Sequence, residues 1–131
     1  NTSKVSITTL DNEIDTEIDA SLFLKIDVEG FEMEVLKGAR ELLSRGKVST
    51  IIIELNGSGE EFGYTDNDIH MLILSFGFKP ISYNPIKREV YEIKTPSEFG
   101  NTIYVKDLDQ VINLCIEAEN VLIHSAFNKV I

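Results

Sequence analysis

The chain has 131 residues, of which 43% are hydrophobic and 26% charged, a composition typical of one globular domain. The net charge of −10, from 22 acidic and 12 basic residues, excludes the basic surface that nucleic-acid backbones require and disfavours anionic membranes. The single cysteine leaves no intramolecular disulfide and favours a cytoplasmic location, and no apolar run approaches the ~20 residues of a membrane helix.

The chain begins with an extended segment, a polar segment and an apolar strand. Residues 4–9 alternate enough to predict a short strand or an extended lead-in. Residues 11–21 are polar and acidic, and they predict a short helix or a loop. Residues 22–27 are almost continuously apolar, which is typical of a buried strand in a parallel sheet covered on both faces.

Two helices and a second strand follow. Within residues 31–44, apolar side chains repeat on one helix face, namely Val35, Leu36, Ala39, Leu42 and Leu43. Gly46 stands where a helix end favours a left-handed residue. Residues 50–55 are rich in isoleucine and predict a second buried strand. Thr65 and Asp68 have the spacing of a capping box, which predicts the start of a second helix.

The last third of the chain holds strand patterns without a helix between them. Residues 79–83 and 89–93 predict a hairpin, and residues 103–105 predict a further strand. A final helix is indicated by an apolar stripe at Leu108, Val111, Ile112, Cys115 and Ala118. The first part requires right-handed parallel crossovers and the last part an antiparallel excursion at the sheet edge. No repeat or linker divides the sequence, so residues 1–131 are predicted to form a single α/β domain.

Carboxylates close two of the predicted strands. Asp27 and Glu29 end the first strand one residue apart, and Gly30 lets the chain turn into the helix. Because strand residues alternate between faces, Asp27 and Glu29 are expected to point to the same side. Glu54 closes the next strand. Ligands of open α/β sheets bind beyond the carboxyl ends of the strands, so these carboxylates mark the candidate site.

Each candidate residue has a structural and a chemical interpretation. Asp27 and Glu29 could stabilise the helix start through its dipole, or they could take a proton from a substrate hydroxyl as catalytic groups. Lys25 is expected on the face of Asp27, either paired with a carboxylate or positioning a substrate. Glu54 and Asn56 could cap loops or bind substrate. The three carboxylates together could hold a divalent cation through their oxygens.

Other reactive side chains point less strongly to chemistry. His70 lies among the polar positions of its helix and His124 lies near the chain end, and both are interpreted as solvated. Cys115 lies on an apolar stripe and is interpreted as a core residue.

A strand-end aspartate with Lys106 after a late strand also fits a phosphoacceptor receiver domain. That fold needs a helix between its last two strands, which residues 78–105 do not offer.

Four motifs, in order along the chain, resemble the C-terminal half of FkbM-family methyltransferases. They are Thr9-Leu10-Asp11, Lys25-Ile26-Asp27-Val28-Glu29-Gly30, Leu36-Lys37-Gly38-Ala39 and Ile51-Ile52-Ile53-Glu54. The resemblance runs from Val5 to Glu54 and continues more weakly to Val105. It implies an enzyme that uses S-adenosylmethionine and methylates hydroxyl groups, mostly of sugars or natural products.

The resemblance also implies a fold and roles for residues. The implied fold is a Rossmann-like class I methyltransferase sheet, mixed and mostly parallel, with helices on both faces and one reversed strand at its end. Asp27 would lie beside the transferred methyl group, and Glu29 and Glu54 would shape the cofactor or acceptor sites. The family's glycine-rich first strand–turn, which holds the methionine end of the cofactor, has no counterpart here. The chain is therefore expected to be the C-terminal portion of that fold and to be inactive alone.

The absent strand–turn has consequences for assembly. It would leave one edge of the strand from Leu22 to Asp27 without a neighbour, and unpaired backbone groups are costly when buried. We expect the chain to form a homo-oligomer through this edge, to aggregate, or to cover the edge with residues 4–9. We also expect weak binding of S-adenosylmethionine or none. A non-catalytic interaction module of methyltransferase ancestry is the alternative interpretation.

Overall fold

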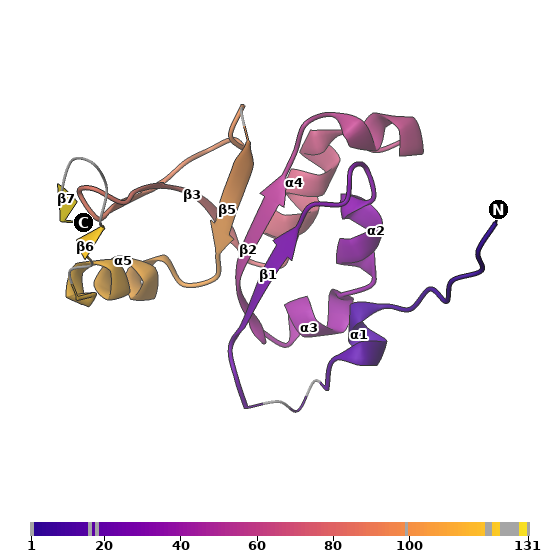
Figure 1. Cartoon of the computed structure of the whole chain (residues 1–131), viewed down its shortest axis with the longest axis horizontal. Helices are drawn as coiled ribbons and strands as arrows, with labels where there is room; N and C mark the ends of the chain where they lie inside the picture. The colour runs from indigo at the N-terminus through magenta and orange to yellow at the C-terminus, as the bar shows by residue number, and fades with distance from the viewer. Residues whose placement is uncertain are drawn as a thin grey trace.

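The computed structural model describes residues 2–15, 17, 19–98, 100–119, 122–123 and 129–130. A five-stranded sheet in the order β1-β2-β5-β3-β4 forms its centre (Figure 1). The strands are β1 (Leu22–Ile26), β2 (Val48–Glu54), β3 (Lys79–Asn84), β4 (Glu89–Glu92) and β5 (Asn101–Val105). The helices are α1 (Leu10–Glu13), α2 (Glu32–Lys37), α3 (Arg40–Ser44), η1 (Ser58–Phe62, a 3-10 helix), α4 (Asp66–Ser75) and α5 (Leu108–Glu117). A separate two-stranded sheet pairs β6 (Leu122–Ile123) with β7 (Lys129–Val130).

The strand pairings confirm the predicted crossover and the antiparallel excursion. β1 and β2 are parallel neighbours, with Leu24 opposite Ile51, and α2 and α3 lie between them in the chain. β5 pairs antiparallel with both β2 and β3, and β3 forms the predicted hairpin with β4. A mostly parallel sheet was the wrong expectation for the described strands, because only the pairing of β1 with β2 is parallel. Among the described residues β3, β4 and β5 follow α4 with no helix between them, and a short connection joins the antiparallel neighbours β3 and β4.

The predicted helix over residues 31–44 is two short helices. α2 ends at Lys37 and α3 begins at Arg40, with Gly38 between them. The N–H of Asp11 donates to the carbonyl of Gly38 at 2.9 Å. The carboxylate of Asp11 then accepts the N–H groups that open α3, from Glu41 at 2.9 Å and Leu42 at 3.1 Å. Asp11, in α1, therefore caps α3 and satisfies N–H groups at its start that would otherwise lack partners.

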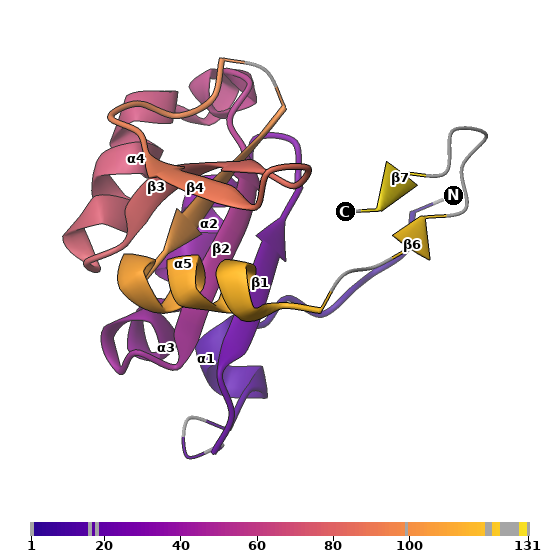
Figure 2. The same cartoon turned by 90° about the vertical axis from the view of Figure 1, so that its left-hand side faces the viewer.

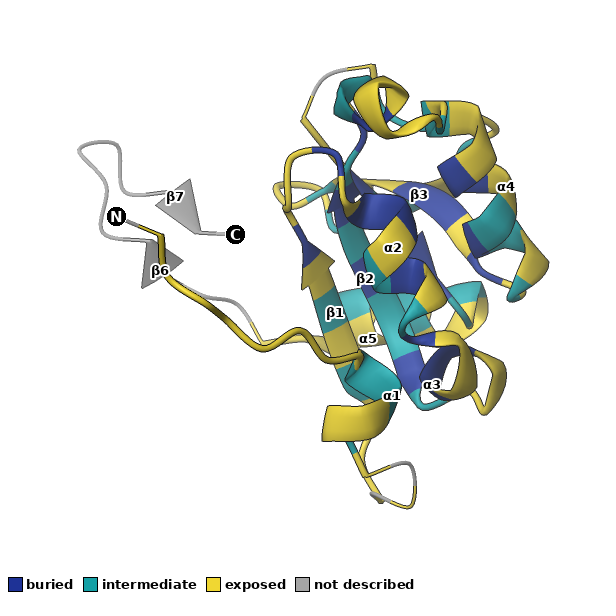
Figure 3. Ribbon diagram, turned by 90° about the vertical axis from the view of Figure 1, so that its right-hand side faces the viewer, coloured by how far each residue is buried: buried dark blue, intermediate teal, exposed yellow. Residues whose placement is uncertain are grey.

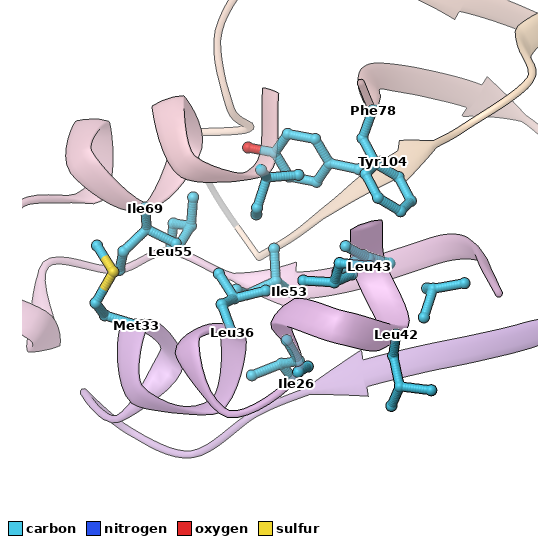
Figure 4. Close-up of a cluster of buried hydrophobic side chains, with 14 residues drawn as sticks. Ile26, Met33, Leu36, Leu42, Leu43, Ile53, Leu55, Ile69, Phe78 and Tyr104 are labelled. Atoms are coloured by element: carbon cyan, nitrogen blue, oxygen red, sulfur yellow. The ribbon is translucent and has the colours of Figure 1, made fainter. Parts of the chain in front are cut away.

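The main core lies between the sheet and α2, α3 and α4. Side chains from both layers interdigitate in it (Figure 4). Among the most buried are Ile26, Leu36, Leu42, Leu43, Ile51, Ile53, Ile69, Ile73, Phe78 and Tyr104, each at most 2% exposed. Lys106 lies at the edge of this core, where its ammonium group donates to the carbonyls of Leu43 and Phe76 at the ends of α3 and α4. Burial lowers the pKa of Lys106.

The opposite face of the sheet carries α5 alone among the described helices (Figure 2). No residue of α5 is buried, and a largely apolar cavity of about 180 Å³ lies between this helix and the sheet. Cys115 and Phe23 both line it, yet Phe23 is 60% exposed. The expectation that β1 is buried on both faces was therefore wrong. Its residues alternate between the core and this open face (Figure 3).

Most sequence signals for the ends of helices and for the amino-terminal segment predicted the structure correctly. Thr65 and Asp68 form the capping box of α4, with reciprocal side-chain to backbone hydrogen bonds. Gly46 has a φ of 71° after α3, as a left-handed helix end requires. Residues 2–9 form no strand, so they are an extended lead-in, and α1 is the short helix expected after them. Within the described residues, no helix combines the length and apolarity needed to cross a membrane.

Candidate functional site

The candidate site follows the carboxyl ends of β1 and β2. Ile26 is paired with Ile53, so Asp27 and Glu54 come next on neighbouring strands at the same level. Glu54 is in turn paired with Asn101 of β5. Because side chains alternate along a strand, Asp27 and Glu54 belong to the face of the sheet that carries α5, opposite the main core. The fold thus brings Asp27, Glu54 and Asn101, from three neighbouring strands, into one row at this end of the sheet.

Asp27 is held by Lys25. The ammonium nitrogen of Lys25 lies 2.7 Å from Oδ2 of Asp27, and the two side chains are 53% and 46% exposed. Both the shared face and the predicted pairing are therefore confirmed. The predicted burial of Lys25 was wrong, because the open face of β1 leaves this ion pair in solvent. An exposed pair of this kind adds little stability, so its consequence is to orient the carboxylate.

The turn after Asp27 is tightly constrained. Glu29 has a φ of 49° and Gly30 a φ of 105°, so the strand alternation that predicted a shared face for Asp27 and Glu29 ends before Glu29. A Cβ at Gly30 would lie 2.8 Å from the carbonyl oxygen of Ser58 and 2.8 Å from the ring of Phe62. Only glycine fits both the backbone angle and this space. The turn is therefore packed directly against η1, which follows β2.

Glu32 is a buried carboxylate that the sequence analysis did not select. It is 3% exposed, and its two carboxylate oxygens accept the N–H of Gly30 at 3.1 and 3.0 Å. An acidic residue at the start of a predicted helix, two residues after a turn glycine, is the sequence signal that could have identified it. Glu32 therefore fixes the turn through the N–H of Gly30. Asp27 and Glu29, in contrast, are exposed to solvent.

Asn56 lines a cleft whose lining does not include Asp27. Its side-chain oxygen accepts the N–H of Ser58 at 3.0 Å, which supports the loop-capping interpretation. The cleft is open, has a volume of about 470 Å³ and lies beyond the carboxyl end of β2. The other polar residues along this cleft are Asp66, Asn67, Ser97 and Glu98. Asp66 accepts the N–H of Gly57 there with both carboxylate oxygens, at 3.2 and 3.1 Å.

A buried polar pair joins α4 to β5. Nδ1 of His70 is 2.8 Å from the hydroxyl of Tyr104, and these residues are 5% and 0% exposed. Burial lowers the pKa of His70, whereas burial together with the negative charge of Asp66 raises the pKa of Tyr104. The expectation of a solvated His70 was therefore wrong. Its position directly after the core residue Ile69 was the available signal. His124 lies outside the described residues.

The carboxylates do not assemble a ligand set for a metal. Across the described part of the chain, no three side chains among histidine, cysteine, aspartate and glutamate converge as metal ligands do. Asp27, Glu29 and Glu54 share one end of the sheet, but they do not form such a group. The hypothesis of a divalent cation at the strand ends has no support in the described structure.

Comparison with known proteins identifies the family. A family model described as a methyltransferase FkbM domain matches residues 1–80, which include α1 to α4 and the parallel pair β1–β2. No curated protein and no solved structure matches the sequence. The matched region contains the turn after β1, the Lys25–Asp27 pair and the end of β2. The chain therefore belongs to the FkbM methyltransferase family.

Proposed function

We propose that this protein transfers a methyl group from S-adenosylmethionine to a hydroxyl group of a sugar or natural-product acceptor. The observation that carries the proposal is the family match, which covers residues 1–80 and contains the exposed carboxylate of Asp27 at the end of β1. A ligand in an open α/β sheet lies beyond such strand ends. We also propose a cytoplasmic location, in keeping with the single cysteine.

The sheet supports a relation to the class I methyltransferase fold. β5 runs opposite to both β2 and β3, so β1, β2 and β3 share one direction and a reversed strand lies between β2 and β3. Class I sheets, by resemblance, also have one reversed strand in their last part, which here is β5. We propose that the chain is the C-terminal portion of such a Rossmann-like sheet. Helices on both faces, with α2, α3 and α4 on one and α5 on the other, agree with this architecture (Figure 2).

The proposed chemistry assigns a separate task to each candidate residue. S-adenosylmethionine would supply a methyl group on its sulfonium sulfur. The acceptor oxygen would attack the methyl carbon in line, so that the carbon–oxygen bond forms as the carbon–sulfur bond breaks and the sulfur leaves as a thioether. Asp27 takes the hydroxyl proton, and Lys25 orients the carboxylate through its 2.7 Å hydrogen bond. Glu29 and Glu54 flank this position, while Asn56 and the polar cleft next to it contact the acceptor.

The experiment replaces the central carboxylate without changing its shape. In the natural protein that contains this chain, Asp27→Asn should lower turnover by at least the ~10²-fold typical of losing a positioned base. Asp109→Asn is the matched control, because it removes one exposed carboxylate from α5, which lies outside the row of polar residues at the carboxyl ends of β1 and β2. Unchanged turnover in Asp27→Asn would remove this residue from the mechanism.

A non-catalytic module of the same ancestry is the second candidate. It is favoured by the absence, within these 131 residues, of the glycine-rich turn that the resemblance assigns to the cofactor. We therefore propose that the 131-residue chain binds S-adenosylmethionine weakly or not at all by itself. Isothermal titration calorimetry on the purified chain measures this directly, and tight stoichiometric binding would contradict it. Absence of methyl transfer by the natural protein as well would favour the non-catalytic module.

A further inference from the structure

Buried polar side chains hold loops in this fold. Among the described residues the buried polar or charged side chains are Glu32, His70 and Thr102, at 3%, 5% and 1% exposure. Glu32 holds the turn after β1 through the N–H of Gly30. The other two contact residues 94–98, a segment without helix or strand that leads from β4 toward β5. A buried polar group is costly unless it is hydrogen-bonded, so each of these contacts fixes a loop to the core.

Thr102 holds the segment near its end. The hydroxyl oxygen of Thr102 accepts the N–H of Ser97 at 2.9 Å. In the sheet, Thr102 is paired with Ile53 of β2, and Glu54 follows as the last residue of that strand. The hydrogen bond therefore fixes Ser97 close to the carboxyl end of β2, where the candidate site lies.

His70 holds the segment near its start. The backbone of Lys94 acts on the ring of His70 as a hydrogen-bond partner, which partly offsets the lowering of its pKa by burial. Nδ1 of His70 is 2.8 Å from the hydroxyl of Tyr104, which points toward α4 (Figure 4). Tyr104 comes two residues after Thr102 on β5, so the two side chains share the core face of this strand. One face of β5 therefore supports both ends of the segment.

Residues 96–98 line the cleft beyond the carboxyl end of β2. The cleft has a volume of about 470 Å³, and its remaining lining comes from the loop after β2 and the start of α4. That part of the lining is held by Asp66, whose carboxylate accepts the N–H of Gly57 with both oxygens. The part that residues 96–98 contribute depends instead on the contacts of Thr102 and His70 with the segment.

We propose that Thr102 positions residues 94–98 for an acceptor that binds in this cleft, and that the acceptor is a sugar without negative charge. This assignment rests on the proposed function, since it places the acceptor of methyl transfer in the cleft. Residues 94–98 form no helix or strand, so without the Thr102 hydroxyl they would have to become ordered when the acceptor binds. Such ordering opposes binding, whereas a lining that is already ordered avoids the cost.

The charge of the lining selects the class of acceptor. Two charged side chains line the cleft, Asp66 and Glu98, and both are acidic; no described residue of the lining is basic. Their carboxylates accept hydrogen bonds from sugar hydroxyls and, more strongly, from an ammonium group. They repel the carboxylate of a sugar acid or the phosphate of a sugar phosphate. A neutral sugar or an amino sugar is therefore the acceptor class that fits this cleft.

Nuclear magnetic resonance on the natural protein that contains this chain tests the assignment, with D-glucosamine as the probe. Addition of D-glucosamine should shift the amide signals of Gly57, Ser97 and Glu98, whereas D-glucuronate, which carries a carboxylate, should not. Thr102→Val should raise the dissociation constant for D-glucosamine by about fivefold or more, as expected when a further residue must be ordered on binding. The order parameters of Ser97 and Glu98 should fall in this variant from ~0.85 to below ~0.6.

Two further variants separate the hydroxyl of Thr102 from its other properties. Thr102→Ser keeps the hydroxyl and should restore both the affinity and the order of the segment. Thr50→Val is the matched control, because it removes a threonine hydroxyl from β2 at a position that does not line this cleft. Circular dichroism confirms that each variant is folded. An ordered segment in Thr102→Val, or a disordered segment with unchanged affinity, would overturn the proposal.

The same titration distinguishes failure of this assignment from failure of the proposed function. Absence of amide shifts at the cleft with D-glucosamine, or equal shifts with D-glucuronate, would overturn the assignment whether or not the protein transfers methyl groups. Shifts that depend on Thr102 in a protein that methylates no sugar would support the cleft as a sugar site. That result would contradict the proposed methyl transfer alone.

Discussion

The two faces of the sheet differ sharply in how they are covered. On one face, Ile26, Ile51 and Ile53 are at most 1% exposed beneath α2, α3 and α4. On the other, Phe23 is 60% exposed and α5 has no buried residue. The first face supplies the packing that stabilises the fold. The second bears Lys25 and Asp27, which remain accessible because little covers them. Stability and candidate chemistry are therefore assigned to opposite sides of the same strands.

The strongest test of this difference is a pair of leucine truncations. Leu36→Ala removes a side chain with 0% exposure from the packed face and should lower the free energy of unfolding by about 2–5 kcal/mol. Leu114→Ala removes the same atoms from α5, where the leucine is 59% exposed, and should cost less than about 0.5 kcal/mol. Urea denaturation measures both values. Equal costs would show that α5 contributes to stability as much as the core helices do.

The turn after β1 provides the next largest effect. Gly30→Ala forces a side chain into a φ of 105° and against Ser58 and Phe62, and it should cost about 3 kcal/mol. Gly46→Ala is the matched control, because Gly46 also has a positive φ, 71°, but no atom lies within 4 Å of its added Cβ. We expect a cost of about 1 kcal/mol there. Thermal melts compare the two, and similar shifts would mean that η1 moves aside without penalty.

The buried pair of His70 and Tyr104 should make the packed face sensitive to pH. Because burial lowers the pKa of His70, the unfolded chain binds more protons than the folded chain just below the ordinary pKa of 6.5. The free energy of unfolding should therefore fall as the pH drops from about 7 to about 5.5, by at most about 1.4 kcal/mol per pH unit. His70→Gln should remove this slope. His124 is the same in both proteins, so an unchanged slope would exclude His70 as its source.

The smallest predicted effect concerns the start of α4. Thr65→Ala removes the side chain that accepts the N–H of Asp68 and should cost about 1 kcal/mol. Thr65→Ser keeps the hydroxyl and should be close to neutral. Chemical denaturation of the two variants measures the difference. A loss for serine as large as that for alanine would point to the methyl group of Thr65 and not to its hydrogen bonds.

The sequence predicted most elements but not the contacts that divide them. Hydrophobic periodicity correctly predicted β1, β2, the β3–β4 hairpin and a helix between β1 and β2. It did not reveal that this helix divides at Gly38. The division depends on the carboxylate of Asp11, which accepts the N–H of Glu41 although the two residues are 30 positions apart. The family motifs Thr9-Leu10-Asp11 and Leu36-Lys37-Gly38-Ala39 thus meet in space. Local patterns cannot show such a meeting in advance.

The candidate site was predicted in part for a similar reason. Strand alternation placed Lys25 and Asp27 together, because that rule depends only on neighbours in the chain. It failed at Glu29, where the backbone leaves the extended conformation at a φ of 49°. It also overestimated the burial of β1, since an apolar strand looks the same in sequence whether one face or both are covered. His70 was misjudged because its partner Tyr104 lies 34 residues away.

The contact between Asp11 and α3 also decides where the chain can be shortened or fused to a tag. Residues 2–8 are exposed and belong to no helix or strand, so an added sequence at that end has room in solvent. Thr9 is different, because its hydroxyl accepts the N–H of Asn12 and starts the helix that carries Asp11. A protein that begins after Thr9 would lose the cap of α1, and Asp11 would then no longer be held against the start of α3. Truncation should therefore stop before Thr9.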